Sequence, residues 1–386
     1  MACGKAGNPI AEAWGKRNVK KRVAIVTYHR AMNFGAKLQA YALQEVLREQ
    51  FDTRILDYRC SAIESVFYPR LSWSQKLRSA VKALVMPEIS RAFRERKHRF
   101  HEFDKRLLLS TTYDANTVKA AAEKFDCFVA GSDQVWNLSI SGNDANYFLA
   151  FAQDRQKYSY AASFGGSIDT NTTGGDVPAL LEGFQSLLIR EQTGVDYVNR
   201  LNLSATGYRT VDPVFLIEKD RWIKSMSLSQ NGSTEPYILV YFVAMRQQTN
   251  ALQFAKKLAA KHGCKVILIN AGNPTDPQIV YRNDVGPVEF LELILNARTV
   301  VTTSFHAEAF SIIFNKPFYY ELTHFHNNTN DRLTGLAELF GLSDRQITGV
   351  EAEESPIDWD AVNQKILEYR SQSRALLFET LGSERK

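Results

Sequence analysis

Short apolar runs alternate with helical patterns over the first part of the chain. Residues 23–28 form a β-branched run, Asn33–Gly35 form a polar loop, and apolar residues recur at helical spacing over 38–50. A second run at 54–58 completes a β-α-β unit, whose strands we expect to be parallel with a right-handed crossover. Three further runs are short and apolar, as interior strands of a parallel sheet are: 125–131, 158–164 and 187–190.

The alternation starts again after residues 227–236, which are rich in turn formers and poor in apolar groups, as a linker is. Beyond them the pattern predicts strands at 237–243, 265–270, 299–303 and 318–322, and helices at 250–262, at 288–297, from about 307, and at 358–381. We therefore expect an α/β protein with two parallel sheets. Its predicted parts are a tail at 1–21, a first Rossmann-like domain at 22–226, the linker at 227–236, a second Rossmann-like domain at 237–357 and a terminal helix at 358–386.

Residues 70–106 differ in charge from the rest of the first domain. They hold 11 Lys and Arg against 4 Asp and Glu, a local balance of +7, whereas the whole chain carries only +5. Apolar residues recur there at helical spacing: Trp73, Leu77, Val81, Leu84 and Val85. Arg78 and Lys82 fall off that stripe, so we expect an amphipathic helix followed by a more charged one. Two interpretations stay open: a solvated helical hairpin that covers the sheet, or a surface that contacts acidic phospholipid or a lipid-diphosphate substrate.

The overall composition narrows the function classes. A net charge of +5 is too mild for a nucleic-acid binder and suits an anionic substrate better. The four cysteines lie far apart, which argues against a disulfide framework and a structural zinc site. Residues 1–18 lack the apolar core of a signal peptide, and no apolar run approaches the roughly 18 residues of a membrane-spanning helix. We expect a soluble, cytoplasmic protein.

Polar residues that directly follow strands are the candidates for chemistry, because ligands of open parallel sheets bind beyond the carboxyl ends of the strands. Four places qualify: Asn33–Gly35, Gly131–Asp133, Arg190–Glu191 and Ser304–His306. The Asn33 loop lacks a GxGxxG pattern, and the chain has no GxxxxGKS/T motif. Nicotinamide binding and P-loop nucleotide binding are therefore both unsupported.

Each candidate also has a structural interpretation. Ser132 and Asp133 offer a hydroxyl and a carboxylate that can orient or deprotonate a substrate hydroxyl, or they cap the next helix. Arg190 provides either a fork for phosphate or carboxylate, or half of an ion pair with Glu191.

His306 stands where a helix is predicted to begin, and the helix dipole there disfavours the cationic form. It needs an anionic ligand to act as an acid, or it is a structural histidine. Glu308 is either its partner or a first-turn carboxylate. His324 and His326 form an HxH pair, but we do not expect a metal site, because no further ligands cluster at suitable spacing.

Taken together, these stretches resemble the polysaccharide pyruvyltransferase family. Residues 131–137 read Gly-Ser-Asp-Gln-Val-Trp-Asn and are similar to the family's GSDQVWN segment, which is the most specific match. Residues 33–43 are similar to its opening loop and helix, N-x-G-x-x-L-Q-x-Y-A-L. The other stretches follow in the family's order: 160–165, Arg190–Glu191, Asp212–Pro213, Ser304–His306 and Lys316–Phe318. The resemblance covers about residues 22–340 and implies a GT-B-like fold, with two Rossmann-like domains facing a cleft.

The resemblance implies transfer of an enolpyruvyl unit from phosphoenolpyruvate to a sugar, which gives a pyruvate ketal across two hydroxyls. The acceptor would be a glycan of an exopolysaccharide or capsule, or its undecaprenyl-linked precursor, met in the cytoplasm or at the inner face of the membrane. Phosphoenolpyruvate would be a co-substrate, with no cofactor, metal or nucleic acid involved. Such a reaction needs an acid to protonate C3, cationic clamps and a base.

Roles follow from position in the family pattern. The resemblance makes His306 the candidate acid, Arg190 the clamp on phosphate or carboxylate, and Asp133 the base that orients the acceptor. Further residues would line the site: Asn33, Gly35, Gly131, Ser132 and Ser304. Many family members carry Arg-Leu-His where this chain has Ser304-Phe305-His306, so one guanidinium is missing. The candidates to replace it are Lys37, Lys316 and Arg332.

Two other functions stay open. A GT-B-like glycosyltransferase that uses a nucleotide sugar would bind a nucleoside diphosphate and ignore phosphoenolpyruvate. A catalytically idle glycan-binding protein that kept the fold would bind glycan without consuming the donor, and the serine at position 304 favours it.

Overall fold

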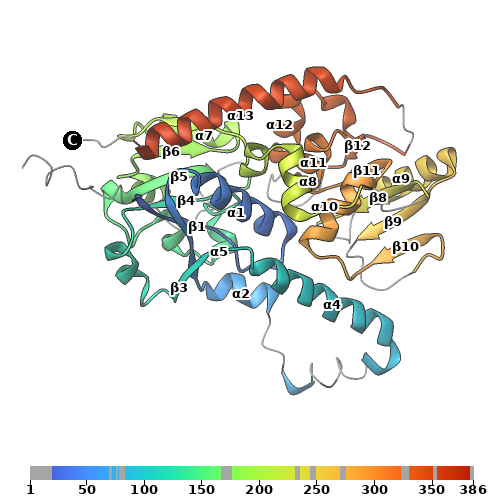
Figure 1. The fold of residues 1–386 in the computed structure, drawn as a ribbon, viewed down its shortest axis with the longest axis horizontal. Helices are drawn as coiled ribbons and strands as arrows, with labels where there is room; N and C mark the ends of the chain where they lie inside the picture. The colour runs from blue at the N-terminus through green and yellow to red at the C-terminus, as the bar shows by residue number, and fades with distance from the viewer. Residues whose placement is uncertain are drawn as a thin grey trace, which may run out of the picture.

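Two parallel sheets with helices on their faces lie side by side (Figure 1). The computed structural model describes residues 20–68, 72–74, 77, 83–166, 176–230, 235–243, 249–269, 275–322, 330–350 and 354–382. None of its described helices is both long enough and apolar enough to cross a membrane.

The first sheet has seven strands in the order β3-β2-β1-β4-β5-β6-β7, and every neighbouring pair is parallel. Its strands are β1 (Arg22–Val26), β2 (Asp52–Tyr58), β3 (Leu109–Tyr113), β4 (Cys127–Ala130), β5 (Lys157–Ala162), β6 (Ser186–Ile189) and β7 (Gly207–Arg209). The interior strands β4 and β6 are buried along their whole length, because helices cover both faces. The strand order reverses between β1 and β4, which is therefore the switch point where ligands of such sheets bind.

Helices and short 3₁₀ turns connect these strands. The α-helices are α1 (Phe34–Leu47), α2 (Ser61–Phe67), α4 (Pro87–Asp104), α5 (Leu138–Ser141), α6 (Val177–Leu181), α7 (Gln192–Arg200) and α8 (Lys219–Met226). The 3₁₀ turns are η1 (Val118–Glu123), η2 (Ala145–Phe148), η3 (Asp154–Gln156) and η4 (Pro213–Leu216). The helix α1 begins four residues earlier than its apolar periodicity predicts, because Asn33 caps it by accepting a hydrogen bond from the Ala36 amide at 3.1 Å.

The second sheet has five parallel strands in the order β10-β9-β8-β11-β12, with its own switch point between β8 and β11. Its strands are β8 (Tyr237–Tyr241), β9 (Lys265–Ile269), β10 (Ile279–Arg282), β11 (Thr299–Thr302) and β12 (Phe318–Tyr320). Its helical elements are α9 (Thr249–His262), α10 (Pro287–Asn296), α11 (Phe305–Ile313), α12 (Asp331–Phe340), the turn η6 (Ser343–Arg345) and α13 (Trp359–Gly382). The α/β class with two parallel sheets, predicted from the alternating pattern, is confirmed.

A cluster of aromatic rings joins the two halves. Phe34, the first residue of α1, stacks on Phe290 of α10 with 4.5 Å between ring centroids, and both rings are buried. It also contacts Tyr241 of β8 and Phe100 of α4, each at 5.3 Å. One continuous hydrophobic core therefore runs from the first sheet into α10 and α11. Burial on this scale fixes how the halves face each other.

The last described helix, α13, starts near the second sheet and lies across the first (Figure 1). Near its middle, Tyr369 packs on Phe340 of α12 at 6.0 Å. Further along, the Ser373 hydroxyl accepts a hydrogen bond from the backbone amide of Val211 at 3.1 Å. The helix thus contacts both halves.

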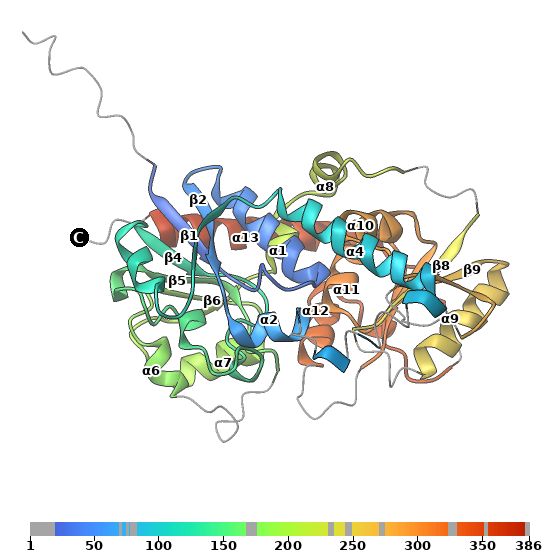
Figure 2. The same cartoon turned by 90° about the horizontal axis from the view of Figure 1, so that it is seen from below.

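The helix α4 crosses the junction on another side (Figure 2). Arg99 donates a hydrogen bond to Asp284 at 3.0 Å, and its Nε lies 3.6 Å from Glu289 of α10. Arg96, one of the basic residues of the 70–106 segment, is buried, and its guanidinium carbon lies 5.2 Å from the centre of the Phe34 ring. It therefore cannot belong to a solvated basic face.

The apolar stripe ahead of α4 does not cover the sheet. Trp73, Leu77, Leu84 and Val85 are between 54% and 83% exposed, so the interpretation of a stripe packed on the sheet is wrong for these residues. Val81, Arg78 and Lys82, which belong to the same prediction, lie outside the described residues.

Candidate active site

Segments that are far apart in the sequence converge on the carboxylate of Asp212. Ser132 Oγ donates a hydrogen bond to Asp212 Oδ2 at 2.7 Å, and Arg190 Nη1 donates to the same oxygen at 3.0 Å. His306 Nε2 lies 3.6 Å from that oxygen. Ser132 and Arg190 follow β4 and β6 of the first sheet, whereas His306 follows β11 of the second. The cluster is therefore shared between the halves, and all four side chains are buried.

Asp212 is held as a carboxylate by its neighbours. Burial alone would raise the pKa of Asp212, but His306, Arg190 and the Ser132 hydroxyl outweigh that effect and hold the pKa well below its ordinary value. Asp212 thus presents a buried carboxylate to the imidazole of His306.

His306 is tightly seated at the start of α11. The helix begins at Phe305, and Ser304 caps it by accepting a hydrogen bond from the Ala307 amide at 3.4 Å. The imidazole packs directly against the backbone of Gly35, where an added Cβ would lie only 2.0 Å from Nδ1. No residue larger than glycine fits at position 35 without moving His306.

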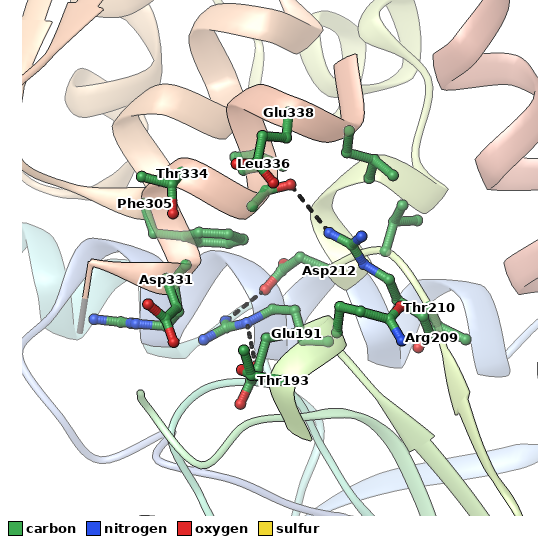
Figure 3. Close-up of a pocket in the computed structure, with 16 residues that line it drawn as sticks. Glu191, Thr193, Arg209, Thr210, Asp212, Phe305, Asp331, Thr334, Leu336 and Glu338 are labelled. Carbon is green, nitrogen blue, oxygen red and sulfur yellow. Dashed lines mark hydrogen bonds and ion pairs between the residues drawn. The ribbon is translucent and has the colours of Figure 1, made fainter. Parts of the chain in front are cut away.

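A cavity of about 220 Å³ opens beside this cluster, between the two halves. Its walls come from residues 190–193 and 209–212 of the first half, and from Phe305 and α12 of the second. Figure 3 shows Asp212 and Phe305 on its inner walls, and it shows Arg209 reaching the backbone of α12, where Nη2 donates to the Gly335 carbonyl at 3.0 Å. The Arg190 guanidinium carbon lies 4.4 Å from the centre of the Phe305 ring.

Two guanidiniums in this cavity have unused hydrogen-bond donors. Arg190 Nε and Nη2 and Arg332 Nε are buried and have no hydrogen-bond partner among the described residues. With the Gln134 amide turned so that both groups are satisfied, its oxygen accepts from Arg332 Nη1 at 2.9 Å and from Nη2 at 3.1 Å. Burial and the nearby Arg190 lower the pKa of Arg332 to about 10, so Arg332 stays charged at neutral pH. Unpaired donors on buried cations are costly, and an anion would satisfy them.

Carboxylates also line the cavity, but two of them are already engaged. Glu191 accepts a hydrogen bond from the Phe164 amide at 2.7 Å, and Asp212 holds the cluster described above. The other two, Asp331 and Glu338, are partly or fully exposed at the α12 wall. The inner wall therefore carries two guanidiniums, Arg190 and Arg332, beside two buried carboxylates. Arg190 makes the ion pair with Glu191, since its Nε lies 3.9 Å from Glu191 Oε2, and its Nη1 also pairs with Asp212. Its role as a fork for phosphate or carboxylate stays a prediction.

The segment 131–137 does not cap a helix through Ser132 or Asp133. The next helix, α5, is capped by Asn137, which accepts a hydrogen bond from the Ser139 amide at 3.2 Å. The helix-cap alternative is therefore wrong. Asp133 instead has a φ of 82°, in the left-handed region that residues other than glycine rarely adopt. Its side chain is partly exposed and accepts a hydrogen bond from the Gln134 amide at 2.8 Å.

The remaining predicted site residues lie in different places. Asn33 is committed to capping α1, and Gly131 lies at the sheet, where its amide donates to the Val26 carbonyl at 2.9 Å. Lys316 does not line the cavity; burial and the nearby Lys219 lower its pKa. Lys37 faces a second cavity. Of the three candidates for the missing guanidinium, Arg332 alone lines the cavity that contains Arg190.

The central carboxylate was not among the candidate residues. In the sequence, Asp212 shows nothing more than the signal of an ordinary turn, an Asp-Pro pair at the end of the first unit. In the structure, its Oδ1 caps η4 by accepting a hydrogen bond from the Val214 amide at 3.1 Å. Its other oxygen holds the cluster together. A rule that looks only at residues directly after strands misses it, because Asp212 stands beyond the end of β7.

Glu308 is not the partner of His306. It is completely buried on α11, and neither carboxyl oxygen has a hydrogen-bond partner among the described residues. Burial raises the pKa of Glu308 well above its ordinary value. The HxH pair, His324 and His326, lies outside the described residues.

A second cavity, of about 420 Å³, opens beyond the ends of β1 and β2. Its inner wall is a closed network of charges. Asp57 accepts hydrogen bonds from His29 Nε2 at 3.1 Å and from two nitrogens of Arg30, each at 2.9 Å. Lys37 is buried and donates both to the His29 carbonyl and to Asp104. Tyr68 and His101 stand at the more exposed part of the wall.

Comparison with known proteins decides the family. The family model described as polysaccharide pyruvyl transferase matches residues 33–320. The chain belongs to this family. The matched residues include Gly35, Ser132, Arg190, Asp212 and His306, whereas Arg332 lies beyond them. No curated protein matches the chain in sequence.

Solved structures support the fold alone. The UDP-N-acetylglucosamine 2-epimerase from Rickettsia bellii has a TM-score of 0.51 at 10% identity, with 95% of this chain and 100% of that chain covered. The UDP-GlcNAc 2-epimerase from Neisseria meningitidis, bound to UDP-GlcNAc, has a TM-score of 0.50 at 9% identity, with 94% and 99% covered. The fold of this pyruvyl transferase family member is therefore GT-B-like.

Proposed function

We propose that this family member transfers a pyruvyl group from phosphoenolpyruvate to a saccharide and forms a pyruvate ketal across two hydroxyls. The observation that carries the proposal is the set of unpaired N–H groups of Arg190 and Arg332 beside His306. Phosphoenolpyruvate presents a phosphate and a carboxylate, and two planar guanidiniums can each bind one of them in a forked geometry. The cavity of about 220 Å³ also suits a small anion, since pockets for drug-sized ligands measure roughly 300–1,000 Å³.

The proposed chemistry begins with proton transfer to carbon. Protonated His306, held in position beside Asp212, donates its proton to C3 of the enol, and the first sugar oxygen bonds to C2. The bond from C2 to the phosphate oxygen then breaks, and phosphate leaves with the electron pair. A second hydroxyl bonds to C2 and closes the ring. Of the two protons released by the hydroxyls, one restores His306 and the other leaves on the phosphate.

The two aspartates are proposed to have separate roles. Asp212 is fully buried and already accepts hydrogen bonds from Ser132 and Arg190, so it positions His306 rather than contacting substrate. Asp133 is partly exposed and stays our proposed base for the acceptor hydroxyl. Arg332 is proposed to supply the guanidinium that serine replaces at position 304.

We place the saccharide acceptor in the second cavity. Gly35 and Lys37 lie in the same turn of α1, and the first contacts His306 whereas the second lines this cavity. The two cavities thus adjoin one short segment. Carboxylates, two guanidiniums and the ring of Tyr68 line the second cavity, and these groups suit the hydroxyls and apolar face of a sugar. The acceptor would belong to an exopolysaccharide or capsule, either free or on a lipid carrier.

The test measures phosphate release from phosphoenolpyruvate with a panel of free and lipid-linked glycans. We expect release only with a suitable acceptor. His306→Gln should lower turnover by roughly 10²- to 10⁴-fold while calorimetry still detects donor binding. A protein that binds a nucleoside diphosphate and ignores phosphoenolpyruvate would instead be a nucleotide-sugar transferase. One that binds glycan but never binds or consumes the donor would be a catalytically idle glycan-binding protein.

A further inference from the structure

Exposed apolar side chains gather in one short segment of the chain. Thirteen large hydrophobic side chains are exposed in the described residues, and eight of them fall between residues 66 and 93. Six of these define what we call the apical patch: Trp73, Leu77, Leu84, Val85, Met86 and Phe93. The other five of the thirteen are scattered over the rest of the molecule, as single exposed apolar residues ordinarily are.

The apical patch stands away from both sheets. Figure 1 shows the N-terminal end of α4 projecting beyond the body of the molecule, while its C-terminal end lies beside α2. The four most exposed members, Trp73, Leu77, Leu84 and Val85, show between 54% and 83% of their surface to solvent. Apolar side chains that protrude in this way can insert into an apolar environment such as the interface of a bilayer.

Positive charge surrounds the patch. Arg91, Arg94 and Lys97 are all exposed on α4, directly after the apolar residues. Residues 70–106 carry 11 basic and 4 acidic residues, a balance of +7 in a chain whose total is +5. The excess positive charge of the protein therefore falls in the same stretch of sequence as its exposed apolar side chains.

We propose that the apical patch docks on an anionic lipid bilayer, with its apolar side chains in the interface and Arg91, Arg94 and Lys97 at the lipid headgroups. An exposed tryptophan beside apolar and basic residues is the usual composition of an interfacial membrane anchor. Charge complementarity selects the partner, because the inner leaflet carries anionic lipids and attracts basic segments. A second copy of the chain would instead bring these cations against one another.

Docking of the apical patch on a bilayer would fix the orientation of the whole molecule, because α4 is held firmly by the rest of the protein. α4 is fixed at its C-terminal half by Phe100 and Phe103 in the core, and by Arg99, which pairs with Asp284 and Glu289. The same helix lines the second cavity through His101 and Asp104. If the proposed function holds, the cavity for the saccharide would lie close to the bilayer, which suits an acceptor carried on a lipid. The docking itself needs no substrate and can be tested without any.

The experiment measures flotation of the purified protein with vesicles of phosphatidylcholine alone or mixed with phosphatidylglycerol. We expect binding to the mixed vesicles, weakened by high salt. Leu84→Glu/Val85→Glu should abolish it, whereas the matched control Val280→Glu/Leu367→Glu, at exposed apolar positions elsewhere, should not. Arg91→Gln/Arg94→Gln/Lys97→Gln should weaken binding about a hundredfold, at roughly fivefold per cation. The control Lys119→Gln/Lys124→Gln/Arg155→Gln makes the same change of charge at exposed positions far from the patch and should have little effect.

Circular dichroism of each variant checks that it is folded. Absence of binding to the mixed vesicles at low salt would overturn the proposal, as would equal binding by the patch and control variants. A wild-type dimer in solution that becomes a monomer in Leu84→Glu/Val85→Glu, without vesicle binding by either, would identify the patch as a contact between copies and overturn it as well.

Discussion

The two cavities use buried charge in opposite ways. In the cavity between the halves, Arg190 and Arg332 retain donors that no described residue satisfies. In the second cavity, Asp57 accepts from both His29 and Arg30, so its charges are matched within the protein. Charged groups whose hydrogen bonds are all satisfied within the protein form a rigid wall. Buried cations with unpaired N–H groups cost folding free energy, and an anion that binds to them removes that cost. This difference is the reason for our proposal that the charged donor binds in the first cavity and the neutral sugar in the second.

The largest effect should come from Gly35→Ala, which acts on one cavity only. The new methyl group would overlap the His306 ring, and displacement of a reacting group by about 1 Å can cost 10²-fold in rate. We expect kcat to fall by about that factor while the acceptor KM changes little, measured by steady-state phosphate release. Gly349→Ala is the control, because nothing lies within 4 Å of a Cβ at that position. A normal kcat in Gly35→Ala would contradict the prediction that turnover depends on the position of the His306 ring.

A comparison of Arg332→Gln with Arg30→Gln tests the contrast between unpaired and paired cations directly. Charged hydrogen bonds contribute about 1.5–3 kcal/mol, so Arg332→Gln should weaken phosphoenolpyruvate binding roughly 10- to 100-fold in calorimetry. Arg30→Gln should leave donor binding unchanged and instead lower the free energy of unfolding in denaturant titrations, since the buried carboxylate of Asp57 loses one of its charged partners. Equal loss of donor binding in both variants would contradict the assignment of the cavities.

The smallest effect should follow from Tyr68→Ala at the second cavity. Loss of an aromatic contact costs about 0.5–1.5 kcal/mol, so the acceptor KM should rise roughly 2- to 12-fold with donor binding unchanged. Tyr208→Ala, at another exposed tyrosine, is the matched control. An unchanged acceptor KM would place the saccharide elsewhere.

Interior strands could be predicted from the sequence and edge strands mostly could not. β4 and β6 are buried on both faces and read as apolar runs. β3, β7 and β10 lie at sheet edges, are only partly buried, and carry no such run, so the pattern missed them. The apolar pattern predicts a helix from about residue 307, but α11 begins at Phe305 because Ser304 caps it.

The candidate site was predicted in part, for a similar reason. Ser132, Arg190 and His306 follow strands directly, and the structure brings all three to one carboxylate. That carboxylate, Asp212, needs tertiary contacts to be found. Arg332 and Lys37 looked equivalent in sequence, and only the path of α12 and α1 places one in each cavity.

The path of α13 has a consequence for how this chain can be divided. The backbone amide of Val211, in the first half, is satisfied by Ser373 of a helix that begins beyond the second half, and Arg374 of that helix pairs with Glu49. A fragment ending at the linker would therefore leave a face of the first sheet open and a buried amide without a partner. The two halves are not interchangeable modules. A chimera that exchanges one of them with a relative must carry residues 359–382 together with residues 22–226.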